Sequence, residues 1–77
     1  MSPEDLRDLL RQRPFRPVQL TFSDGSQHVI PHPEMVLLTR SSVSIGKASD
    51  PESGIADRTS HFSLSHLVRV DPVMVGR

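Results

Sequence analysis

Hydrophobic positions repeat with a helical period at the start of the chain. Three leucines fall at i, i+3 and i+4, on one stripe of a helix: Leu6, Leu9 and Leu10. Ser2 is a favourable N-cap and Pro3 suits the first helical position. Pro14 disfavours helical geometry in the residue before it, so the pattern predicts a helix over about residues 3–12.

From Pro17 the hydrophobic period changes from helical to two. Apolar side chains then alternate with polar ones at Val18, Leu20 and Phe22. This alternation predicts a strand over residues 17–23 with one buried face, followed by a return strand over residues 26–31.

The dipeptide Asp24-Gly25 between these strands is typical of a two-residue hairpin turn, because both central positions of that turn need positive φ. Such a turn places Leu20 opposite Val29. Cross-strand partners share a face of the sheet, so His28 is expected on the outer face. The side chains predicted to face the core are Val18, Leu20, Phe22 and Val29.

The rest of the chain predicts four more short strands, over residues 35–39, 43–47, 60–64 and 67–71. Residues 48–59 contain almost nothing to bury and predict a mobile loop. The fold class expected is therefore α+β, mostly β: an N-terminal helix followed by a small, strongly bent antiparallel sheet or barrel. The leucines of the helix are expected to cover one open side of it.

Length and composition restrict the stability and the partners of the chain. Its 77 residues form one domain, which buries only about 60% of the surface of the unfolded chain. Cysteine is absent, so disulfides and thiolate metal sites are excluded, and self-association is the ordinary route to extra stability. Nine basic and nine acidic side chains cancel, which argues against strong non-specific attraction to nucleic acid or to an anionic membrane.

The distribution of apolar residues also bears on location. No apolar run approaches the roughly 20 residues needed to span a bilayer. The N-terminus is acidic and lacks the basic and apolar regions of a signal peptide. A cytoplasmic protein without membrane contact is the expectation.

Three short motifs carry a resemblance to known sequences: Arg13-Pro14-Phe15-Arg16-Pro17, Asp24-Gly25 and His32-Pro33-Glu34. In this order, after a capped helix with Leu-x-x-Leu-Leu, the chain resembles a group of short uncharacterised bacterial proteins. Members end with a segment similar to residues 63–70. This resemblance implies no established activity.

The order of elements is also similar to that of the Sm-like barrel. That family has a short N-terminal helix, a hairpin closed by a polar-Gly pair and an apolar third strand, here residues 35–38. Its bacterial host-factor form assembles into RNA-binding rings. The resemblance implies a small barrel of the Sm-like or SH3-like kind and single-stranded RNA as an alternative partner. The Tyr-Lys-His that lines the host factor's RNA site has no equivalent in residues 62–64.

Four side chains are candidate metal ligands: His28, His32, Glu34 and His66. Imidazole and carboxylate groups suit zinc, so a metal-dependent hydrolase is the third hypothesis. The alternative is that His32 and Glu34 hold the corner between two strands by hydrogen bonds. No serine lies in a nucleophile elbow and no glycine-rich phosphate loop is present, so we expect neither an enzyme nor a cofactor.

Positive charge is concentrated near the N-terminus, and these arginines are candidates for binding RNA or another partner: Arg7, Arg11, Arg13 and Arg16. The alternative is a solvated helix face, paired with Glu4 and Asp8. The apolar tail Val73-Met74-Val75 is a candidate oligomer interface, because it suits addition to a neighbouring subunit's sheet edge; the alternative is a frayed tail. The leading hypothesis is a non-catalytic, self-associating module that binds another macromolecule, with a protein as the favoured class of partner.

Overall fold

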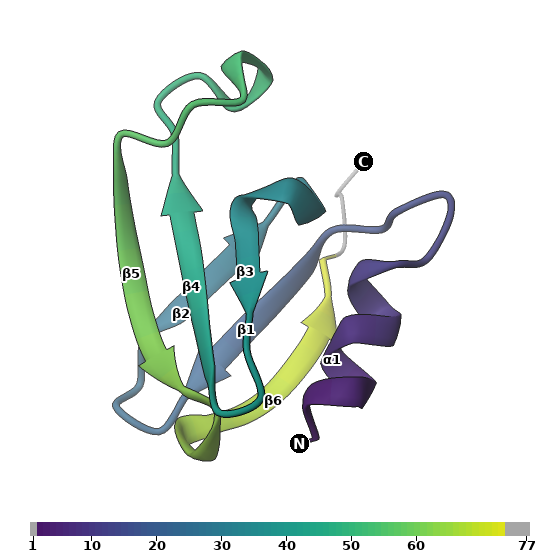
Figure 1. Cartoon of the computed structure of the whole chain (residues 1–77), viewed down its shortest axis with the longest axis vertical. Helices are drawn as coiled ribbons and strands as arrows, with labels where there is room; N and C mark the ends of the chain where they lie inside the picture. The colour runs from purple at the N-terminus through teal and green to yellow at the C-terminus, as the bar shows by residue number, and fades with distance from the viewer. Residues whose placement is uncertain (1, 74–77) are drawn as a thin grey trace.

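One helix and six strands make up residues 2–73, the part of the chain that the computed structural model describes (Figure 1). The elements are α1 (Pro3–Leu10), β1 (Val18–Phe22), β2 (Gln27–Ile30), β3 (Val36–Leu38), β4 (Ser42–Lys47), β5 (Arg58–Ser63) and β6 (Leu67–Pro72). Short 3₁₀ turns follow β2, β4 and β5, at Pro33–Met35, Pro51–Ser53 and Leu64–His66. Within these residues, no helix combines the length and the hydrophobicity that crossing a bilayer requires.

The strands form two antiparallel sheets of three strands each. One sheet has the order β2-β1-β6 and the other the order β3-β4-β5, and Figure 1 shows the two lying across each other. The α+β, mostly-β class predicted from the sequence is therefore confirmed. Strand pairing over residues 2–73 does not close into a barrel, because β3, β5, β2 and β6 each pair on one side only.

The helix begins where the sequence predicts it. The Ser2 hydroxyl accepts a hydrogen bond from the Asp5 N–H at 3.1 Å, which satisfies one of the free donors of the first turn. The helix ends at Leu10, two residues earlier than predicted, and the Arg11 N–H closes it on the Arg7 carbonyl. The last helical carbonyls are thus satisfied before the chain reaches Pro14.

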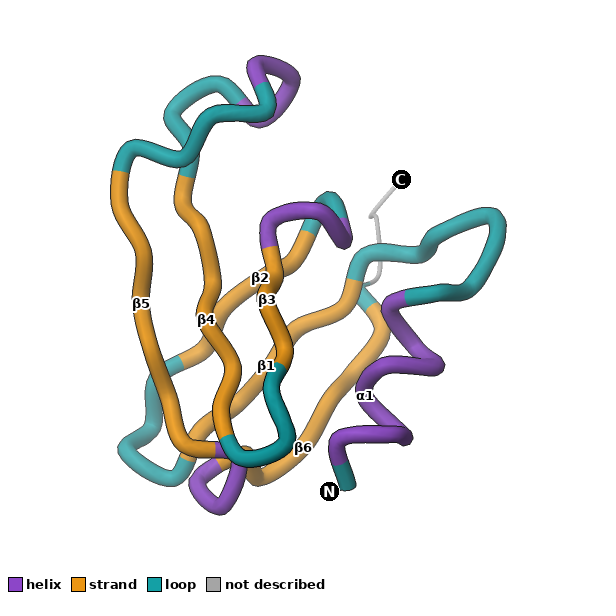
Figure 2. The backbone as a smooth tube through the Cα atoms, viewed as in Figure 1, coloured by secondary structure: helices purple, strands orange, loops and turns teal. Residues whose placement is uncertain are grey.

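The hydrophobic core lies between the two sheets and beneath the helix. Its buried members are Leu6, Leu10, Val18, Leu20, Phe22, Ile30, Val43, Ile45, Leu64 and Leu67. Figure 2 shows α1 beside β6, along one open side of the two sheets. Two of the three leucines of the helical stripe are buried there, and Leu9 is half-buried.

The first hairpin has a different turn from the one predicted. The Gly25 N–H donates to the Phe22 carbonyl at 2.9 Å, and the Phe22 N–H donates to the Ser26 carbonyl at 3.0 Å. Within this hairpin loop only Gly25 has positive φ, +88°, so the loop contains three residues and ends in a glycine bulge. The extra loop residue shifts the pairing by one position, and Leu20 lies opposite His28 instead of Val29.

This shift corrects two predictions, since moving a strand by one residue reverses the faces of its side chains. Val29 is 43% exposed, so its predicted place in the core is wrong. Ile30 is buried in its stead. His28, predicted on the outer face, points inward and contacts the rings of Phe22 and Phe62.

The second long hairpin begins its return earlier than expected. β5 starts at Arg58, two residues before the predicted position, because the Asp57 N–H bonds to the Lys47 carbonyl at 2.7 Å. The Asp57 carboxylate also accepts the Ser49 N–H at 2.7 Å. A side chain at Gly46 would bring its Cβ within 3.0 Å of the Ala56 Cβ. Glycine therefore allows the two ends of the loop to approach closely.

Candidate binding surfaces

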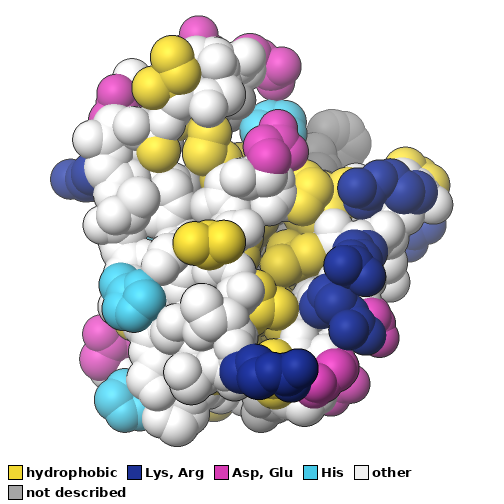
Figure 3. Space-filling view, in the orientation of Figure 1, with side chains coloured by type: hydrophobic (Ala, Val, Ile, Leu, Met, Phe, Trp, Pro, Cys, Tyr) yellow, Lys and Arg dark blue, Asp and Glu magenta, His cyan; other side chains and the backbone are white. Residues whose placement is uncertain are grey.

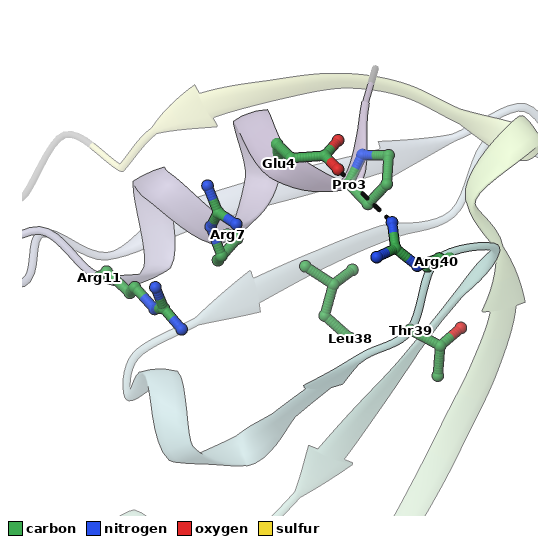
Figure 4. A pocket seen from close by; sticks show the side chains of 7 residues that line it. All are labelled: Pro3, Glu4, Arg7, Arg11, Leu38, Thr39 and Arg40. Atoms are coloured by element: carbon green, nitrogen blue, oxygen red, sulfur yellow. Dashed lines mark ion pairs between the residues drawn. The ribbon is translucent and has the colours of Figure 1, made fainter.

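A groove of about 430 Å³ runs between α1 and the turn that joins β3 to β4 (Figure 4). Arg7 and Arg11 line it from the helix, one turn apart and on the same face. Arg40 lines it from the opposite side, and Leu38 of β3 lies between them. The groove therefore combines three guanidinium groups with an apolar contact.

The arginines of the groove differ in how firmly carboxylates hold them. Arg7 donates two hydrogen bonds to the Asp8 carboxylate, at 3.1 and 3.2 Å, whereas Arg40 lies 3.8 Å from Glu4. The side chain of Arg40 is 92% exposed, and ion pairs this exposed contribute about 0–1 kcal/mol. Among residues 2–73, Arg11 forms no ion pair. An anionic ligand would therefore displace little existing structure.

The other two arginines predicted from the sequence lie beyond the end of the helix. Arg13 and Arg16 line a separate shallow hollow together with Gln12 and Pro14. Figure 3 shows basic side chains gathered on the helix side of the molecule, next to hydrophobic ones. The structure thus brings Arg7 and Arg11 together in one groove but places Arg13 and Arg16 in another.

Sequence analysis missed Arg40 as a site residue. Its local signal, Arg-Ser-Ser between two apolar segments, predicts only a turn. The residue reaches the groove because the β3–β4 turn lies opposite the first turn of α1. No spacing rule within the sequence relates it to the arginines of the helix.

The structure does not bring the four candidate metal ligands together. His28 lies between the sheets, while His66 is exposed on the turn before β6. His32 lies 3.5 Å from Glu52 in the loop, and Glu34 is exposed. Across residues 2–73, no three His, Cys, Asp or Glu side chains are grouped closely enough to hold a metal ion.

His28 has an apolar environment. Its ring centroid lies 5.8 Å from that of Phe22 and 4.9 Å from that of Phe62, and the two phenylalanines stack at 4.0 Å. Its Nε2 atom is buried without a hydrogen-bond partner in the described part of the chain. Burial lowers the pKa of His28 below its ordinary 6.5; the positive charge of Lys47 lowers it further, and Asp24 opposes the shift.

Two further polar contacts lie on the surface. The Asp24 carboxylate accepts the N–H and the hydroxyl of Ser26, and these bonds, with the hydroxyl contributing most, lower the pKa of Asp24. This contact stabilises the hairpin turn. Ser44 Oγ lies 2.6 Å from His61 Nδ1 on adjacent strands of the second sheet. Sequence analysis did not pair these two residues, because they are 17 positions apart.

The unpaired edges of the two sheets differ in how they are protected. β3 has three residues and lies near the helix, and β2 has four residues and ends before Pro31. β6 contains Pro72 and pairs with β1 through an irregular register. β5 has six residues, pairs with β4 without a bulge and contains no proline. Figure 1 shows it at the edge of the molecule opposite α1, with no helix or strand of residues 2–73 beyond it.

The predicted interface at the C-terminal tail is only partly within the described residues. The N–H of Val73 donates to the Pro17 carbonyl at 3.1 Å and continues the pairing of β6 with β1. Met74 and Val75 lie outside the described residues. The structure therefore assigns Val73 a place beside its own chain.

Comparison with known proteins adds no family. The sequence matches no protein-family model, no curated protein and no solved structure. The resemblances to short bacterial proteins and to the Sm-like barrel stay predictions. The features of this chain that bear on function are the groove and the open edge of β5.

Proposed function

We propose that this protein is a non-catalytic binding module that associates with a second copy of itself through β5 and presents its basic groove to another macromolecule. The observation that carries the proposal is the unprotected edge of β5, Arg58–Ser63. The groove supports the second part, because it gathers arginines from two elements that are distant in the sequence.

An exposed strand edge presents a row of free N–H and C=O groups to another chain. Proteins that stay monomeric usually blunt such edges with proline, bulges, charged side chains or a covering element. β5 has one charged residue, Arg58, at its first position, whereas the other three edges are short, irregular or near the helix. A second β5, running antiparallel, would join two three-stranded sheets into one and would make a twofold dimer.

A non-catalytic role fits the chemistry of the groove. Guanidinium groups remain protonated at any physiological pH and bind anions, but they do not exchange protons with a substrate. The groove is also open to solvent on the surface of the protein. This shape suits a segment of a polypeptide chain more than a small substrate that must be enclosed.

Light scattering coupled to size exclusion tests the association directly. At tens of micromolar we expect the parent protein to have the mass of a dimer. The double variant Thr59→Lys/His61→Lys places two charges on exposed positions of β5 and should be monomeric.

The matched control is Gln27→Lys/Val29→Lys, which places the same two charges on exposed positions of the other sheet's edge, β2. This control should keep the mass of the dimer. A monomeric parent protein, or equal dissociation of both variants with circular dichroism unchanged, would contradict association through β5.

A further inference from the structure

We infer that the groove between α1 and β3 binds an extended acidic segment of a protein. This inference depends on the proposed binding role but not on self-association, because the groove is lined by α1, β3 and the β3–β4 turn rather than by β5. The bound segment would carry aspartate or glutamate side chains at intervals, with an apolar residue between them.

Charge complementarity is the first argument for an acidic ligand. Three arginines and one glutamate line the groove; Arg7 is hydrogen-bonded to Asp8, and the two more available arginines, Arg11 and Arg40, lie on opposite walls. Guanidinium groups bind carboxylates through paired N–H donors, which gives these contacts direction as well as strength. The Arg40 guanidinium already lies 3.8 Å from the Glu4 carboxylate, so this position accommodates a negatively charged group.

The floor of the groove is the second argument, because it suits an extended chain. Leu38 and Pro3 offer apolar surface to a small hydrophobic side chain of the ligand. The apolar floor can take a hydrophobic side chain of the ligand, while its acidic side chains reach the arginines on the two walls, as the alternating side chains of an extended chain allow.

The same groove is poorly suited to single-stranded RNA. Proteins that bind single strands stack the bases on exposed aromatic side chains. The sequence contains no tyrosine or tryptophan. Of its three phenylalanines, Phe22 is buried and Phe15 and Phe62 pack against the core.

Fluorescence anisotropy with labelled peptides tests this inference. The probe is a nine-residue peptide that alternates aspartate with leucine, compared with the same peptide carrying asparagine and with a labelled U-rich RNA. We expect the acidic peptide alone to bind, with an affinity that falls as salt rises. Arg11→Gln/Arg40→Gln should weaken this binding about tenfold, since each exposed ion pair contributes a modest amount.

The matched control removes two positive charges outside both the groove and β5, in Lys47→Gln/Arg69→Gln. It should bind the acidic peptide within about twofold of the parent protein. Equal loss in both variants, equal binding of the asparagine peptide, or preference for the RNA would overturn the inference. A dimer that binds no acidic peptide would also overturn it and leave the proposed self-association standing.

Discussion

Different kinds of side chain fill the two sides of the space between the sheets. On one side, the helix places Leu6 and Leu10 in the core beside β3 and β6. On the other, Phe22, His28 and Phe62 bring β1, β2 and β5 together. The first closure is aliphatic and uses a separate element. The second uses side chains of the sheets themselves and includes a titratable ring.

This difference teaches that the two sides respond to different perturbations. Leu6 is fully buried, so its side depends on tight packing. Phe62 is half-buried, and the His28 Nε2 atom has no hydrogen-bond partner within residues 2–73, so the aromatic side is more accessible and sensitive to protonation. Substitutions on the two sides should therefore lower the free energy of unfolding by different amounts, and only the aromatic side should show a dependence on pH.

The largest effect is expected on the helical side. Leu6→Ala removes a buried side chain and should lower the free energy of unfolding by about 2–5 kcal/mol, because the cavity is only partly filled by relaxation. Urea denaturation measures this change. Leu6→Met keeps the volume and should cost less than about 1.5 kcal/mol. Equal losses in the two variants would show that Leu6 does not pack as described.

A smaller effect is expected on the aromatic side. Phe62→Ala loses a stacked contact with Phe22 but starts from a half-buried position, so we expect a loss of about 1–3 kcal/mol. The control Ile55→Ala removes an apolar side chain that is 70% exposed and should leave the unfolding midpoint unchanged. A Phe62 variant as stable as this control would contradict a stabilising role of the aromatic contacts on this side of the core.

The smallest effect is expected in the pH dependence of the free energy of unfolding, and it also arises on the aromatic side. Burial lowers the pKa of His28 in the folded protein, so the unfolded chain takes up a proton at higher pH than the folded one. The contribution of neutral His28 to the free energy of unfolding is fully present above about pH 6.5. It is lost as the pH falls from 6.5 through the pKa of His28 in the folded protein. Urea denaturation at pH 7.5 and 5.5 should show this loss.

Two histidine variants test whether His28 causes this difference between the two pH values. His28→Leu should reduce the difference in stability between the two pH values, because the half-buried titrating ring is gone. His66→Gln removes an exposed histidine and should keep the difference. If both variants keep it, His28 does not carry the pH dependence.

Much of the fold follows from local pattern. The capped helix, the six strands and the loop after β4 were predicted within about two residues, because period, caps and turn residues act over short distances. The register of the first hairpin was not predicted. Asp24-Gly25 is compatible with loops of two or three residues, and the choice between them decides whether Val29 or His28 faces the core.

The candidate surfaces were less predictable than the fold. Arg7 and Arg11 share a helix face by their spacing, and this follows from the sequence alone. Arg40 could not be added to them, because its distance from Glu4 depends on where the β3–β4 turn lies against the helix. The open edge of β5 was equally hidden, since a strand's neighbours are set by the order of strands in the sheet.

The sequence by itself determined the elements of this protein and the leucines that one side of its core would use, because periodicity and capping depend on near neighbours. Only the tertiary structure decided which edges stay open, which arginines meet across the groove and which ring fills the far side of the core. Those features depend on contacts between residues far apart in the chain, and no local pattern encodes them.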